Sequence, residues 1–435
     1  MSAVIDHDVN AAAIAVVSAC VIVWGLVSAR LERWDVTAPI TFLILGLGTA
    51  NGPVAIIHLN LHSSDIRSLA EITLALVLFA DASRVNARAL GADMALPVRL
   101  LGIGLPLTIG AGTVVAAGLF NGVGLWLAAA LGAIVAPTDA ALGASIVQDE
   151  RVPATVRRAL NVESGLNDGI ATPFVNLFLA GALATEAVHT PGVGRAAVDL
   201  LGGAALGAGI GLIGAVLLSR AARTGWSATS SRPLAILALA VFAYASALVA
   251  GINGFIAAFV AGMAFGTVVT DNDLLAFAEE TGTLLSLLVW FMFGAVMVVP
   301  GFEAAGWRSG IFAVLALTVV RMVPVSVALV GAGFDKATVA FIGWFGPRGL
   351  ASVVFGLIAV DSLAAKDAEV VLGAVTVTVT LSVILHGITG SPLAERYGRI
   401  AHQLHRSRPE HNPAAVLSTR RLTRGPRAPD RGQQP

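Results

Sequence analysis

Apolar segments of about twenty residues recur along almost the whole chain and constrain its fold more than any other feature. A helix needs about 20 mostly apolar residues to cross the hydrocarbon of a bilayer. The 435 residues are 56% hydrophobic and 12% charged, whereas about a quarter of the residues of a soluble domain are charged. The pattern predicts an all-α polytopic membrane protein with about thirteen transmembrane helices, over residues 11–29, 38–58, 67–83, 97–119, 124–146, 161–184, 196–219, 233–250, 252–269, 282–299, 309–331, 338–360 and 370–390.

The distribution of positive charge predicts the orientation. Of the 27 Lys and Arg residues, 21 fall in alternate loops on one side and only four on the other. Because cytoplasmic loops carry the excess of Lys and Arg, we expect a multi-pass protein of the cell (inner) membrane with its N-terminus outside and its C-terminus in the cytoplasm. The first ten residues contain no Lys or Arg, so the first span is expected to be retained.

Proline and polar residues interrupt two of the predicted spans. The fifth contains Ala136-Pro137-Thr138-Asp139 and the twelfth contains Gly346-Pro347-Arg348-Gly349. Each break is in the fifth span of a set of six, which favours inverted six-helix repeats with two broken crossing helices. Two unrelated proline kinks are the alternative.

The same count predicts the domain organisation. Residues 1–399 form the transmembrane domain, with one repeat at about 11–184, a connector helix at about 196–219 and a second repeat at about 233–390. Residues 400–435 are rich in Arg and Pro, and we expect a disordered cytoplasmic tail near anionic lipid.

Polar residues within the sixth span point to a functional site. Glu163 and Asn167 share one side of a helix, with Ser164 and Asp168 on the neighbouring stripe. A carboxylate in hydrocarbon costs roughly 2.5–3.5 kcal/mol, so it is a functional-site hypothesis by default. A structural acid satisfied by a neighbouring helix is the alternative, and it is stronger for Glu163 than for Asp168.

Two arginines also fall within predicted spans. Arg321 must face an acid, a carbonyl or water, and we expect Glu163 as its structural partner because their spans hold related places in the two repeats. Arg348 either offsets the dipole ends of the broken helices or forms a second structural pair. Glu71 is balanced between an ion-site residue and a solvated helix start. Asp81, His58 and His386 are expected at span ends, as interfacial or hydrogen-bonded residues.

A dehydrated alkali cation needs several oxygen ligands, and this part of the sequence can supply them. Thr138, Ser164 and a carboxylate oxygen of Asp168 are candidates, with Asp139 binding directly or through water. Asp168 can hold either a proton or a metal ion but not both. Competition at one carboxylate would give exchange with no further coupling device.

At these residues the chain resembles the NhaP-type sodium/proton antiporters of the monovalent cation/proton antiporter-1 family. The resemblance rests on Pro137-Thr138-Asp139, Glu163 to Gly169, Glu71 to Phe79, Arg321 and Gly346 to Gly349. It implies a homodimer of thirteen-helix subunits, in which a six-helix core domain moves against a dimerisation domain.

The resemblance also implies the roles of individual residues. Asp168 would be the exchanging acid, with Thr138, Asp139, Ser164 and Glu71 around the cation. The core would be stabilised by Asn167, Arg348 and the Glu163–Arg321 pair. Electrogenic relatives have a second Asp where this chain has Asn167, so electroneutral exchange is implied.

Other functions fit the sequence less well. A proton-coupled carrier of a small organic substrate would share the broken helices but needs a roomier site, and a channel needs a repeated filter sequence. An enzyme is not expected, because no mid-membrane nucleophile–base pair or HExxH motif occurs, and the lone Cys20 excludes a Cys-based metal site. The expected partners are alkali cations, protons, membrane lipid and a second copy, with no resident cofactor and no nucleic acid.

Overall fold

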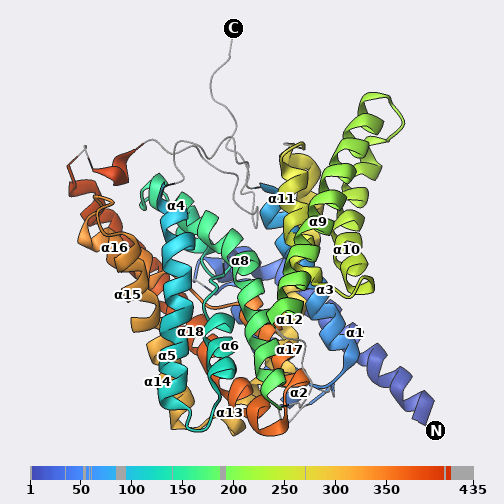
Figure 1. Cartoon of the computed structure of the whole chain (residues 1–435), viewed down its shortest axis with the longest axis horizontal. Coiled ribbons are helices and arrows are strands. Elements are labelled where there is room, and N and C mark those ends of the chain that lie inside the picture. Colours follow the sequence, from blue (N-terminus) through green and yellow to red (C-terminus); the bar gives the residue numbers. More distant parts are fainter. Residues whose placement is uncertain are drawn as a thin grey trace.

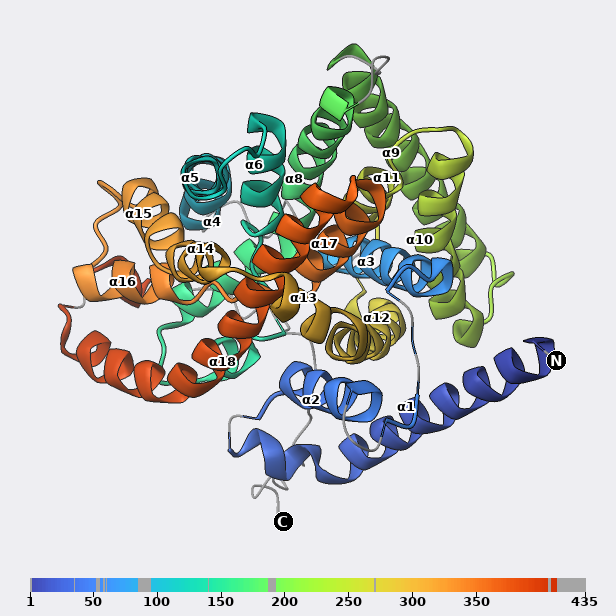
Figure 2. The ribbon, with the colours of Figure 1, turned by 90° about the horizontal axis from the view of Figure 1, so that it is seen from below.

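The computed structural model describes residues 2–34, 36–51, 55–57, 59, 61–84, 95–139, 141–186, 193–269, 271–405 and 408–412. Its regular structure in these ranges is entirely helical. The helices form two groups, which lie on opposite sides of the view in Figure 2 and meet in its centre. We name them the crossing bundle, which contains both interrupted helices, and the flanking bundle.

The crossing bundle takes its helices from two separate parts of the chain, 95–186 and 307–403. Its members are α4 (Ala95–Arg99), the π-helical turn η1 (Leu100–Gly104), α5 (Leu105–Leu119), α6 (Leu125–Ile134), α7 (Ala144–Gln148), α8 (Ala154–Glu186), α14 (Trp307–Leu317), α15 (Val319–Ala328), α16 (Lys336–Trp344), α17 (Leu350–Ser362) and α18 (Ala365–Gln403). The interrupted helices are α6/α7 and α16/α17; in Figure 1, α6 lies beside α5 and α8, and α16 lies beside α15 at the edge of the molecule.

The flanking bundle packs against the crossing bundle mainly through α3, α11 and α13. Its members are α1 (Ser2–Glu32), α2 (Ala38–Asn51), α3 (Ser64–Arg84), α9 (Val193–Arg223), α10 (Arg232–Val249), α11 (Gly254–Gly266), α12 (Asn272–Met292), the π-helical turn η3 (Phe293–Met297) and α13 (Val298–Ala304). Helix α1 packs mainly on α2 and projects from the rest of the molecule (Figure 1).

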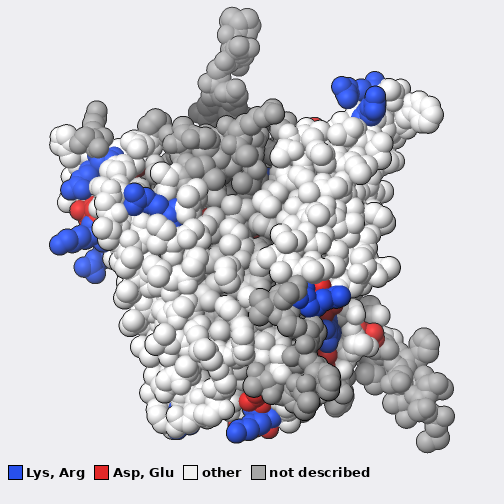
Figure 3. Space-filling view, viewed as in Figure 1, with Lys and Arg blue, Asp and Glu red and all other residues white. Residues whose placement is uncertain are grey.

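The distribution of apolar surface agrees with a membrane protein. In the described part of the chain, seven helices are long and apolar enough to cross a membrane, and four shorter helices are also apolar. Charged side chains lie near the two ends of the face in Figure 3, separated by a broad uncharged band. Each of the thirteen predicted spans overlaps helical residues; the number of crossings and the repeat relation stay predictions.

Glycines allow α11 to lie unusually close to α3. A Cβ atom at Gly262 would be 2.3 Å from the carbonyl oxygen of Phe79, and one at Gly266 would be 2.2 Å from that of Ser83. These glycines are one helical turn apart on the same side of α11. Small residues at this spacing let helix backbones touch, which provides packing energy where lipid removes the hydrophobic driving force.

The end of the chain differs from the prediction of a disordered tail from residue 400. Helix α18 runs to Gln403, and a short turn, η4 (Pro409–His411), follows it. The Glu410 side chain is buried there and accepts hydrogen bonds from Asp335 N (2.8 Å) and Thr338 Oγ1 (2.6 Å) at the start of α16. Residues up to 412 are therefore held by capping contacts that the Arg- and Pro-rich composition concealed, whereas 413–435 lie outside the described residues.

Candidate functional site

The two interrupted helices cross at their breaks, and hydrogen bonds join one break to the other. Asp139 N donates to the carbonyl of Pro347 (2.7 Å), and Leu350 N, at the start of α17, donates to Asp139 Oδ2 (2.8 Å). A Cβ atom at Gly349 would lie 2.0 Å from the same Oδ2, so only glycine fits this contact. The prolines of both motifs, with the glycines of the second, thus interrupt the helices where the two segments pair.

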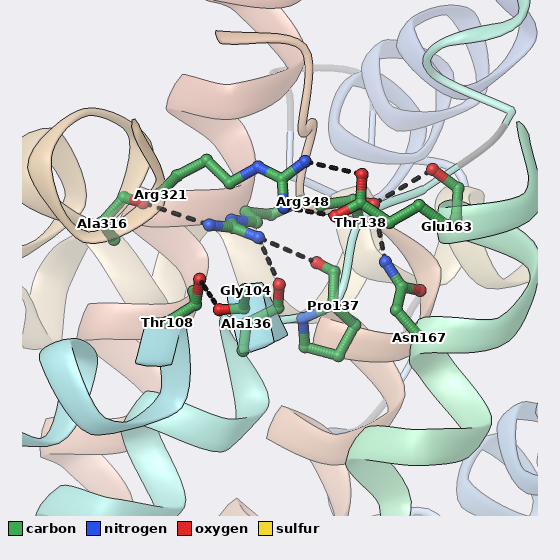
Figure 4. Close-up of polar contacts among 11 residues, drawn as sticks. Gly104, Thr108, Ala136, Pro137, Thr138, Glu163, Asn167, Ala316, Arg321 and Arg348 are labelled. Carbon is green, nitrogen blue, oxygen red and sulfur yellow. Dashed lines mark hydrogen bonds and ion pairs between the residues drawn. The ribbon is translucent and has the colours of Figure 1, made fainter. Parts of the chain in front are cut away.

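Arg348 neutralises the backbone of the opposite break. Its side chain is fully buried, and its guanidinium donates to the carbonyls of Ala136, Pro137 (3.3 Å) and Ala316 (3.2 Å) (Figure 4). Ala136 and Pro137 follow the end of α6, where unpaired carbonyls give a partial negative charge. Of the two roles considered for Arg348, these contacts fit the offset of dipole ends.

Arg321 and Glu163 form a bidentate ion pair inside the crossing bundle. The NH1–Oε1 distance is 2.5 Å and the NH2–Oε2 distance is 2.9 Å, and each residue is 2% exposed (Figure 4). Arg321 follows a kink at Thr318 between α14 and α15 that the sequence analysis missed. A Cβ atom at Gly346 would lie 2.5 Å from Arg321 Nε, so this glycine makes room for the guanidinium.

Three of the predicted site residues meet beside the first break. Thr138 Oγ1 lies 3.0 Å from Ser164 Oγ, and Asn167 Nδ2 donates to Thr138 Oγ1 (2.6 Å). Asp168 lies one helical turn from Ser164 on the same stripe of α8 and is 8% exposed. The buried Thr138 hydroxyl and the half-buried Ser164 hydroxyl therefore meet where α8 passes the break, with Asp168 one turn further along α8.

Asp139 makes more hydrogen bonds to the protein than its predicted role as a cation ligand would need. Besides the bond from Leu350 to Oδ2, its Oδ1 accepts from Ala141 N (2.7 Å) and Leu142 N (3.3 Å). Both oxygens therefore satisfy backbone N–H groups at the starts of two segments. The carboxylate thus fixes the two breaks to each other, and a contact of Asp139 with the cation stays a prediction.

The structure shows protein partners for both carboxylate oxygens of Glu71. Its Oε1 accepts from Arg67 Nε (2.8 Å) and its Oε2 from the hydroxyl of Tyr244 on α10 (2.7 Å). Arg67 also pairs with Asp361 at the end of α17. A place for Glu71 at the cation site stays a prediction, as does the alternative of a solvated helix start.

Asp81, His58 and His386 were also expected at span ends, and the structure describes two of them. The Cβ of Asp81 on α3 lies 3.7 Å from where a Cβ at Gly165 would be, so Asp81 faces α8 one turn before Asp168. His58 lies outside the described residues. His386 and Ser382, buried on α18, contact the second break. Their spacing of four in an apolar span was the signal that would have found them.

The polar groups that meet beside the first break are mainly oxygen atoms. Hydroxyl, carbonyl and carboxylate oxygens are the ligands that hard cations prefer. Within the described ranges, no group of three or more His, Cys, Asp or Glu residues that could hold a metal ion is found.

Comparison with known proteins agrees with this geometry. The chain is similar to the sodium proton antiporter MjNhaP1 of Methanocaldococcus jannaschii. One structure of it, at pH 8, has a TM-score of 0.70 and 19% identity and covers 90% of this chain and 99% of that one. An electron-microscopy structure has a TM-score of 0.69 and 19% identity, covering 88% and 97%. These likenesses confirm the fold expected from the sequence.

Sequence comparisons assign the chain to a protein family. The chain is 29% identical over 254 residues to a probable Na(+)/H(+) antiporter of Schizosaccharomyces pombe, which covers 53% of this chain and 32% of that protein. The chain thus spans about a third of the length of this relative. The family model described as sodium/hydrogen exchanger, transmembrane, matches residues 15–396. The chain is a multi-pass membrane protein that belongs to the sodium/hydrogen exchanger family.

Proposed function

We propose that the protein exchanges one alkali cation, Na⁺ foremost, for one proton, and that the two ions compete for the Asp168 carboxylate. The observation that carries the proposal is the position of Asp168 on α8, buried and one turn from the Ser164–Thr138 hydroxyl pair. Asp168 supplies the negative charge, and the hydroxyls replace part of the water shell of the cation. Li⁺ and K⁺ are the alternative cations.

The hydrogen bonds of Thr138 support its role as a ligand. Its hydroxyl oxygen accepts from Asn167 Nδ2, and its proton is available for Ser164. This leaves lone pairs on both hydroxyl oxygens that can face a cation. Asn167 thus orients a ligand without adding charge, which supports its predicted role in stabilising the core.

Electroneutral exchange follows from the charges around the site. Glu163 and Arg321 neutralise each other, and Asn167 is neutral where a second acid would carry a second proton. Asp139 is committed to backbone N–H groups. One exchanging carboxylate can carry one proton or one monovalent cation per cycle.

A partly exposed stripe of α8 supports access from one side of the membrane. Asn161, Ser164 and Gly165 are half-buried and lie on the stripe that leads from the start of α8 towards Asp168. Asp81 faces this stripe at Gly165. The positive-inside pattern puts this end of α8 in the cytoplasm, so we infer that the ions reach Asp168 from the cytoplasm in this conformation.

Transport also requires access from the other side, and we infer that the crossing bundle moves against the flanking bundle. The breaks and the site residues from Thr138 to Asp168 belong to the crossing bundle alone. A rigid movement of that bundle would carry the site without disrupting its hydrogen bonds. We further infer a homodimer in the cell membrane, with its N-terminus outside and its C-terminus in the cytoplasm.

The test is dissipation of a preset proton gradient in inside-out vesicles on addition of Na⁺, Li⁺ or K⁺ separately. We expect Asp168→Asn to abolish the response and Glu303→Gln, an exposed acid at the end of α13, to retain it. Full activity of Asp168→Asn would contradict competition at this carboxylate. No response of the wild type to any of the cations would favour a proton-coupled carrier of an organic substrate.

A further inference from the structure

Two buried polar residues of α18 contact both ends of the second break. His386 Nε2 lies 2.9 Å from the carbonyl oxygen of Trp344, the last residue of α16, and Ser382 Oγ accepts from Arg348 N (2.7 Å), just before α17. Ser382 is 0% and His386 5% exposed. We propose that Ser382 and His386 are positioning residues for cation binding, acting through the second break on Thr138.

The backbone groups that they bind have few other partners. The last carbonyls of a helix have no intrahelical donor, and in a membrane interior they need partners within the protein. The Trp344 carbonyl also accepts from Gly346 N (2.9 Å), so His386 binds the oxygen about which the chain turns into the break. Loss of the imidazole would leave this turn without its anchor on α18.

Both ring nitrogens of His386 lie near carbonyl oxygens, so a neutral imidazole can donate to one of the two. A neutral histidine carries one N–H, and we place it at Nε2, where it joins α18 to the end of α16. Nδ1 lies 3.3 Å from Ser382 Oγ and 2.8 Å from the Ser382 carbonyl. Because Ser382 Oγ already accepts from Arg348, its own proton is free to be donated to Nδ1. The Nε2–H form thus connects His386, Ser382 and Arg348 in one chain of hydrogen bonds.

That chain continues into the first break. The Arg348 guanidinium holds the carbonyls of Ala136 and Pro137, and the neighbouring Pro347 carbonyl accepts from Asp139 N (2.7 Å). Thr138 lies between Pro137 and Asp139, so contacts from the second break fix the backbone on both sides of it. A displaced second break would therefore move the Thr138 hydroxyl away from Ser164.

This inference rests on the proposed function, because it assumes that Thr138 binds the cation. A residue that merely fills space on α18 would affect folding and protein yield. A positioning residue would change the Michaelis constant (KM) for the cation while Vmax per inserted protein stays nearly constant. The space-filling role and the positioning role can thus be distinguished in purified, reconstituted protein.

The experiment measures Na⁺-driven exchange in proteoliposomes for His386→Leu, His386→Gln, Ser382→Ala and Thr378→Val. Thr378 is the matched control, since it is fully buried one turn before Ser382 and its hydroxyl bonds only within α18, to Ala374 O. We expect His386→Leu and Ser382→Ala to raise the KM for Na⁺ roughly three- to tenfold. His386→Gln should restore it, because its amide N–H can reach the position of Nε2–H.

Three results would overturn the inference: unchanged KM in His386→Leu and Ser382→Ala, an equal rise in Thr378→Val, or no recovery in His386→Gln. If His386→Leu does not fold, Ser382→Ala decides the outcome, because it removes only one oxygen atom. Absence of cation-driven exchange in the wild type is a separate result, which contradicts the proposed function itself and removes the basis of the inference with it.

Discussion

Arg67, in the first turn of α3, forms an ion pair with Asp361, in the last turn of α17, with 2.5 Å between NH1 and Oδ2. The pair joins the flanking bundle to the crossing bundle. It belongs to a larger cluster, because Arg67 also binds Glu71, and Glu71 binds Tyr244 on α10. Movement of the crossing bundle along α3 would have to break the contact at Asp361 while the contacts within the flanking bundle persist.

We expect the two partners of this pair to differ in their effect on stability. The side chains of Arg67 and Asp361 are 37% and 30% exposed, so Asp361→Asn should cost about 0.2–1 kcal/mol. Arg67→Gln should lower the free energy of unfolding by more, because Glu71 then also loses its hydrogen bond from Arg67. Thermal unfolding of both variants and the double variant gives the coupling energy, and equal effects of the two single changes would contradict this hierarchy.

The Glu163–Arg321 pair should show the penalty of a buried single charge. Glu163→Leu leaves Arg321 charged and buried, and Arg321→Leu does the same to Glu163, so each should destabilise by about 3–5 kcal/mol. The double leucine variant removes both charges and should be more stable than either single variant. The measurement is the midpoint of thermal unfolding in detergent. A double variant less stable than both singles would show that the pair contributes more than mutual neutralisation.

Prediction from sequence succeeded where a residue has few ways to be satisfied. An arginine in mid-membrane needs an acid or carbonyls as partners. Arg321 binds an acid, Glu163, and Arg348 binds backbone carbonyls. Prolines beside polar residues located both breaks. The contacts of Glu71 could not be predicted, because whether a carboxylate faces Arg67 and Tyr244 depends on the rotation of α3 and on a helix far along the chain.

The end of the chain shows a second limit of sequence-based prediction. Composition describes the average behaviour of a segment, and an Arg- and Pro-rich segment with few apolar residues averages to a solvated tail. In the structure, the buried Glu410, with hydrogen bonds from Arg408 to Gly333 and from Thr155 to Asn412, holds residues 408–412 against the rest of the protein. The π-helical turns η1 and η3 had no comparable signal, because their residues are as apolar as the helices around them.

Glu410 should stabilise the protein without affecting transport. Its Oε1 accepts from Asp335 N and Thr338 Oγ1. Glu410→Ala leaves the buried Thr338 hydroxyl without this acceptor, which should lower the free energy of unfolding by about 1–3 kcal/mol. The control is Glu395→Ala, since that side chain is 54% exposed and its contact with Arg151 is 3.7 Å. We expect a lower unfolding temperature only in Glu410→Ala, with an unchanged KM for Na⁺ in both. A changed KM would instead connect this segment to the cation site.

Gly349→Ala should disrupt the crossing of the two breaks. The new methyl group would lie 2.0 Å from Asp139 Oδ2, where it displaces the carboxylate from Leu350 N. Gly110→Ala on α5 is the matched control, because nothing lies within 4 Å of its Cβ position. We expect exchange to be lost in Gly349→Ala and retained in Gly110→Ala, measured per milligram of reconstituted protein. Normal exchange in Gly349→Ala would show that transport does not require the contact between the two breaks.

Competition at one carboxylate predicts a specific dependence of transport on pH. A proton on Asp168 excludes the cation, so the apparent KM for Na⁺ should rise as the pH falls, by at most about tenfold per pH unit, while Vmax at saturating Na⁺ stays constant. Asn167→Asp adds a second acid to the site, in contact with Thr138 where the amide N–H was. We therefore expect its KM to rise more steeply with falling pH and its rate to respond to membrane potential. A wild-type KM that is independent of pH would mean that proton and cation occupy separate groups, and Asp168 would then have to act as a fixed ligand.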